Sequence, residues 1–71
     1  MRADVDILRT WVGEVVERAG YGGARKLANA ADVPEPVLSR FRAGKGLPDR
    51  YRLPLQEACA RSLPFNELEA A

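Results

Sequence analysis

Eight basic side chains lie between residues 18 and 52 of this 71-residue chain, accompanied there by only three acidic ones. The segment therefore carries a net charge of +5, whereas residues 1–17 and residues 53–71 each carry −2. The chain as a whole is nearly neutral, at +1. Basic groups concentrated in one segment of a neutral protein favour a local binding surface for an anion. A merely solvated basic surface is the alternative.

Catalytic and metal chemistry find little support in the composition. The chain has no histidine and one cysteine, Cys59, which excludes structural zinc and the common Ser/His and Cys/His nucleophile pairs. The ten acidic residues are more simply solvated surface than a catalytic pair. We therefore expect no enzyme activity, no catalytic residue, no metal, no cofactor and no small-molecule ligand.

The elements that must position the basic groups are helices. Apolar residues recur at three- and four-residue intervals over residues 4–19, which predicts an amphipathic helix. Asp4 is suited to cap its start and Gly20 to end it. Three more helices are expected, at residues 23–30, 35–43 and 53–62.

Prolines mark the boundaries of the later elements. Pro54 lacks an amide hydrogen, so we expect a turn over residues 49–52 and a helix that begins near Leu53. Pro64 is expected to begin a last short helical segment. No segment alternates as a strand does, so the sequence predicts one all-α domain, 1–71, of four to five short helices.

The stretch 23–45, GARKLANAADVPEPVLSRFRAGK, combines two short helices with a break at Asp32. Two short helices joined by a tight turn form the helix-turn-helix unit, whose second helix enters the DNA major groove. The stretch resembles the helix-turn-helix of the phage repressor and Cro type. The residues that carry the resemblance are Leu27, Ala28, Val33, Leu38 and Phe41, with the closing LSRFRAGK. The resemblance implies a lambda-repressor-like fold.

Two residues depart from the family pattern. Asp32 stands where the family often has a glycine, at a turn position whose backbone is left-handed; aspartate tolerates this conformation better than most residues. Pro34 stands where a capping serine or threonine often opens the second helix, which removes one amide and one hydroxyl from that position.

The resemblance and the helical period together predict the DNA contacts. If Leu38 and Phe41 face the core, the rest of helix 35–43 is turned toward the groove. Arg40 can donate two hydrogen bonds to guanine, and Glu35 can accept one from a cytosine amino group. Val37 or Pro36 can make an apolar contact with a thymine methyl. The predicted base contacts are Glu35, Pro36, Val37, Ser39 and Arg40. The predicted phosphate contacts are Gly23, Arg25, Lys26, Arg42, Lys45 and Arg50.

The function implied is that of a sequence-specific transcriptional regulator, a small repressor of phage or mobile-element type that binds operator DNA as a homodimer. Leu63, Phe65 and Leu68 either form the dimer surface or close the monomer core. A small protein-binding module, antitoxin-like or directed to the transcription machinery, is the alternative that the acidic ends favour. The N-terminal residues lack the pattern of a secretory signal, and no apolar run is long enough to span a membrane, so we expect a cytoplasmic protein.

Overall fold

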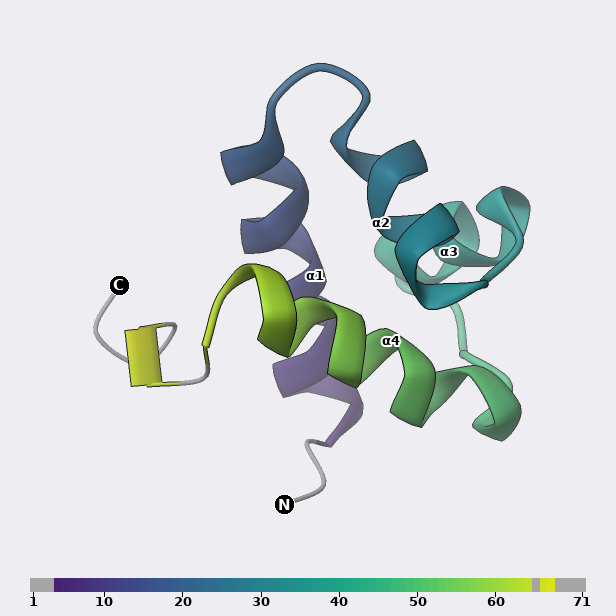
Figure 1. Cartoon of the computed structure of the whole chain (residues 1–71). Helices are drawn as coiled ribbons and strands as arrows, with labels where there is room; N and C mark the ends of the chain where they lie inside the picture. Colours follow the sequence, from purple (N-terminus) through teal and green to yellow (C-terminus); the bar gives the residue numbers. More distant parts are fainter. Residues whose placement is uncertain (1–3, 65, 68–71) are drawn as a thin grey trace.

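Four α-helices make up the computed structural model, which describes residues 4–64, 66 and 67 (Figure 1). The described residues contain no strand, so the all-α class is confirmed. The helices are α1 (Val5–Ala19), α2 (Gly23–Ala31), α3 (Glu35–Arg42) and α4 (Asp49–Ser62). Helices α1 and α2 each contact the other three, and the contacts of α2 are the most extensive, so α2 occupies the centre of the arrangement.

Both ends of α1 follow the sequence prediction. The Asp4 side chain accepts a hydrogen bond of 2.9 Å from the Ile7 amide, as an N-cap residue does. Gly20, at the other end, has a φ of 76°, which is open to glycine and costly for most other residues. The second and third helices also end within one residue of the predicted limits.

The core contains apolar side chains from all four helices. Val33, in the turn after α2, and Leu63, directly after α4, also belong to it. Trp11 is 3% exposed, and its indole Nε1 donates a 2.7 Å hydrogen bond to the Leu63 carbonyl. A buried indole N–H needs such a partner, because an unpaired one would lose its hydrogen bond to water. The core residues are Leu8, Trp11, Val12, Val15, Leu27, Ala28, Ala31, Val33, Leu38, Phe41, Leu55, Ala58, Cys59 and Leu63.

The turn between α2 and α3 is centred on Asp32, whose φ of 56° and ψ of 43° lie in the left-handed region. The left-handed backbone predicted for this residue is confirmed. Its amide donates to the Asn29 carbonyl, and the next amide, of Val33, donates 2.9 Å to the Ala28 carbonyl. These bonds satisfy carbonyls at the end of α2 that have no partner within the helix. Val33 is thereby turned into the core.

The prediction for Pro54 was wrong, because α4 is one continuous helix from Asp49 to Ser62 with Pro54 inside it. Pro54 is the sixth helical residue, and its missing amide leaves the Arg50 carbonyl without its usual helical donor. Packing holds the two sides of the proline in one helix. Tyr51, half-buried against the core, and Leu55, fully buried, are four residues apart and share a face of α4.

Within the part of the chain that the structure describes, no helix combines the length and the apolar character that a membrane crossing requires. Residues 66 and 67 have helical backbone, and the amide of Glu67 donates 3.0 Å to the Pro64 carbonyl. Phe65 and Leu68, which were expected in this segment, lie outside the described residues.

Gly23, at the start of α2, lies against the backbone of α1. A Cβ atom placed there would lie 2.6 Å from the Val16 carbonyl oxygen and 2.9 Å from the Cβ of Ala19. Because a backbone oxygen cannot move aside alone, Gly23→Ala should force the two helices apart. We expect a loss of about 1–3 kcal/mol in the free energy of unfolding, measured by urea denaturation.

Gly13→Ala is the matched control. Nothing lies within 4 Å of a Cβ at this helical position, so the substitution should leave stability unchanged or raise it by up to about 1 kcal/mol. Equal effects of the two substitutions would contradict the close approach.

The buried thiol of Cys59 should make the free energy of unfolding depend on pH. Burial raises the pKa of its thiol from 9.0 to about 12. Between these values the unfolded chain releases a proton that the folded chain keeps, so the free energy of unfolding should fall as pH rises from about 9 toward 12. Cys59→Ala should reduce this fall, because the variant has no thiol whose proton the folded chain retains. Denaturation at several pH values would compare the two proteins; parallel curves would show that the thiol does not contribute.

Candidate nucleic-acid interface

Helix α3 has a buried side and an exposed side. Leu38 and Phe41 are 1% and 0% exposed and attach α3 to the core. Pro36, Ser39 and Arg40 lie on the opposite side of the helical turn and are exposed. Pro36 and Ser39 are short side chains, so the exposed side can approach a partner closely, with Arg40 as its one long charged group.

The two remaining predicted base contacts lie at the flanks of this exposed side. Val37 is half-buried and packs against the core, so only part of its side chain is available to a partner. Glu35 is exposed, but its carboxylate oxygen lies 3.6 Å from Nε of Arg25, in the first turn of α2. The structure therefore brings together a predicted base contact and a predicted phosphate contact as an ion pair.

Five cations of the basic segment have no carboxylate partner. Among the described residues, no carboxylate oxygen lies within 4 Å of their charged nitrogens, and all five are exposed. They are Lys26, Arg40, Arg42, Lys45 and Arg50. The guanidinium of Arg50 also lies 4.8 Å from the ring centre of Tyr51, as a cation–π contact requires. Positive charge is thus left available along the segment where the sequence concentrates it.

Gly23 is not available as predicted. It is buried, and its amide already donates a 3.0 Å hydrogen bond to the Gly20 carbonyl. The expectation that this amide offers itself to a phosphate is therefore wrong for this conformation. The reason is the close approach of α1 and α2, which uses the glycine for packing.

Arg9 is a residue of this region that the sequence reasoning missed. Its Nε donates 2.9 Å to the Phe41 carbonyl, and one terminal nitrogen donates 3.0 Å to the Lys45 carbonyl. The guanidinium also lies 4.8 Å from the ring centre of Phe41. A cation at the C-terminal end of a helix satisfies carbonyls without helical partners and meets the negative end of the helix dipole. Arg9 thus fastens the end of α3 and the following turn to α1.

The sequence contains only a weak signal for this role. Arg9 follows Leu8, a core residue, on an otherwise regular amphipathic helix, so its stem had to lie at the edge of the buried stripe. Its partners are 32 and 36 residues further along the chain, and no local pattern identifies them.

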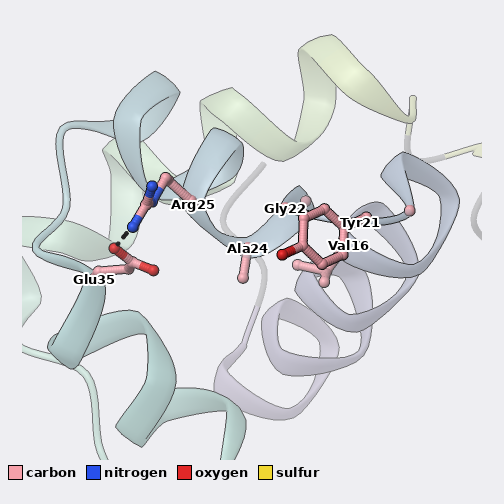
Figure 2. A pocket seen from close by; sticks show the side chains of 8 residues that line it. Val16, Tyr21, Gly22, Ala24, Arg25 and Glu35 are labelled. Atoms are coloured by element: carbon pink, nitrogen blue, oxygen red, sulfur yellow. Dashed lines mark ion pairs between the residues drawn. The ribbon is translucent and has the colours of Figure 1, made fainter.

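A shallow pocket of about 410 Å³ lies beside the Arg25–Glu35 ion pair (Figure 2). Figure 2 shows Arg25 and Glu35 on one side and Tyr21 and Val16 on the other. Tyr21 is fully exposed in the α1–α2 loop. The pocket thus connects that loop, the start of α2 and the start of α3 into one surface.

Leu63 does not form a dimer surface. It is 1% exposed, and its carbonyl accepts the Trp11 hydrogen bond, so it closes the core of the monomer, which was the alternative expected for it. Phe65 and Leu68, its predicted companions, lie outside the described residues.

No group of three or more potential metal ligands occurs in the described ranges, 4–64 and 66–67. Comparison of the chain with protein-family models, with curated proteins and with solved structures finds no match.

The Arg9 contacts predict a stability effect larger than that of an ordinary surface arginine. Arg9→Met keeps most of the apolar stem and removes both hydrogen bonds to carbonyls. We expect a loss of about 1–3 kcal/mol in the free energy of unfolding by urea denaturation, since hydrogen bonds from a charged donor are stronger than neutral ones and the bond to the Phe41 carbonyl is partly buried. Arg18→Met is the control, because Arg18 has only an exposed pair with Glu14 at 3.9 Å and should cost less than about 1 kcal/mol. A loss for Arg9→Met no greater than that for Arg18→Met would contradict the role of Arg9.

Proposed function

We propose that this protein is a sequence-specific DNA-binding regulator that inserts α3 into the major groove as the second helix of a helix-turn-helix. The observation that carries the proposal is the charge distribution around α3. Arg40, Arg42 and Lys45 are exposed at and just beyond its C-terminal half without carboxylate partners among the described residues. Cations left unpaired in this way are the groups that neutralise DNA phosphates.

The backbone supports the same proposal. Helices α2 and α3 are short and are joined by three residues, 32–34, with a left-handed turn residue at Asp32. The exposed side of α3 is narrow, because Pro36 and Ser39 are small. The major groove is about 12 Å wide and admits an α-helix, and the short side chains let the backbone of α3 approach the base edges.

Within this proposal the exposed residues have different roles. Arg40 reads a base, because it extends from the side of α3 opposite the core and its guanidinium forms two parallel hydrogen bonds with guanine. Lys26, Arg42, Lys45 and Arg50 anchor the phosphate backbone, which gives affinity without sequence preference. A protein of this kind represses transcription by occupying its operator, and we propose that role here.

We also propose that two copies bind one operator. A single α3 contacts few base pairs, and two-fold dimers of helix-turn-helix proteins gain specificity by reading two half-sites about 34–36 Å apart. Sedimentation of the protein on its best site should show two copies per duplex; one copy would contradict the dimer without affecting the role of α3.

Two substitutions test base reading against phosphate anchoring. The best site is first selected from a random DNA pool. Arg40→Ala should cost about 1–3 kcal/mol on that site and relax the preference at one base pair. Lys26→Ala should weaken binding to the selected site and a scrambled duplex alike, and should lower the slope of log affinity against log salt by about one. Lys26 lies in the first turn of α2, where a cation opposes the helix dipole, so its removal should leave folding intact.

Titrations at several salt concentrations decide between the outcomes. If Arg40→Ala weakens both duplexes equally, Arg40 contacts phosphate and α3 does not read bases as proposed. If the wild-type protein binds no duplex, or binds without a steep loss of affinity as salt rises, the protein-binding module becomes the better interpretation.

A further inference from the structure

The ion pair between Arg25 and Glu35 joins the first turns of α2 and α3. Nε of Arg25 lies 3.6 Å from Oε2 of Glu35, and the two side chains are 74% and 53% exposed (Figure 2). The other described ion pairs join residues three or four apart on one helix. This pair alone among them connects the two helices of the proposed DNA-binding unit.

We infer that Glu35 is a specificity-determining residue that competes with DNA phosphate for Arg25. The inference rests on the proposed function. Arg25 lies in the same first turn of α2 as Lys26, a proposed phosphate contact without a carboxylate partner. The two cations differ because a carboxylate already neutralises one of them. A phosphate that approaches this turn finds Lys26 available and must displace Glu35 to reach Arg25.

The ion pair is strong enough to weaken a contact between Arg25 and phosphate, and weak enough for phosphate to displace Glu35. An exposed ion pair of this kind changes an equilibrium by a factor of only about 1.4 to 5. Phosphate contacts made without sequence preference are each weak, so a loss of this size at one contact is significant for random DNA. At a selected site that presents a cytosine amino group, the Glu35 carboxylate accepts a hydrogen bond from the base instead, which releases Arg25 to the phosphate. Glu35 therefore lowers the affinity for random DNA more than the affinity for the best site.

The carboxylate also acts directly on the DNA. An acidic group in the first turn of α3 lies at the edge of the surface that would face the phosphates, where it repels any backbone that is misplaced. Direct repulsion and competition for Arg25 both predict that Glu35→Gln strengthens binding to random DNA. Only competition predicts that the effect depends on Arg25.

A double-mutant cycle separates the two effects. The wild-type protein, Arg25→Gln, Glu35→Gln and the double variant are titrated with a random-sequence duplex and with the selected site at one low salt concentration. Glu35→Gln should raise the affinity for random duplex about two- to fivefold and reduce the ratio of selected to random affinity. Arg25→Gln should lower random-duplex affinity less than twofold in the wild-type background, and about two- to fivefold in the Glu35→Gln background.

Glu14→Gln is the matched control for net charge. Glu14 pairs with Arg18 on α1, at 3.9 Å, and its removal changes the charge of the protein by the same amount. It should raise random-duplex affinity less than Glu35→Gln does. Circular dichroism of each variant checks that the exposed substitutions leave the fold intact.

The outcomes distinguish this inference from the proposed function. If the wild-type protein binds DNA but the effects of Arg25→Gln and Glu35→Gln are additive, Glu35 acts by repulsion alone and the competition is contradicted. If Glu35→Gln has no larger effect than Glu14→Gln, Glu35 has no special role in specificity. If no variant binds any duplex, the proposed function fails, and the inference fails with it.

Discussion

The left-handed backbone at Asp32 is the constraint on which the arrangement of α2 and α3 depends. A right-handed residue there would prolong α2 and carry the next residues away from the core. Instead the chain reverses, the Val33 amide returns to the Ala28 carbonyl, and the Val33 side chain enters the core. Leu38 and Phe41 then attach α3 on its inner side. The exposure of Arg40 on the outer side follows from these contacts.

The basic residues divide into those that stabilise the fold and those that remain available. Arg9 donates to carbonyls at the end of α3, and Arg61 donates 3.3 Å to the Ala30 carbonyl near the end of α2. Both therefore cap the helices of the middle segment from the flanking helices α1 and α4. Arg40 and Lys45, by contrast, have no carboxylate partner in the described part of the chain. The flanking segments thus supply two structural cations, and five of the eight cations of the middle segment stay exposed without a carboxylate partner among the described residues.

Local signals in the sequence predicted most of the fold, because they depend on nearby residues. The cap at Asp4, the stop at Gly20 and the left-handed turn at Asp32 each involve neighbours in the chain. Pro54 was misjudged because packing of Tyr51 and Leu55 on a shared face outweighs the loss of one helical hydrogen bond. The hydrogen bonds from Arg9 to the end of α3 and the ion pair of Arg25 with Glu35 were not predicted, because both join residues from separate helices. The packing role of Gly23 was missed for the same reason.

The hydrogen bond from Trp11 to the Leu63 carbonyl joins residues 52 positions apart. It closes the core between the first helix and the residue that follows the last turn of α4. Helix α2 packs against both α1 and α4, which lie toward the two ends of the segment between Trp11 and Leu63. A shorter segment of the chain therefore lacks part of the core. During synthesis the ribosome releases the chain from its N-terminal end, and Trp11 is exposed long before Leu63 exists. The native core therefore cannot close before residue 63 has been synthesised, and this domain folds as one all-or-none unit only after its last core residue is present.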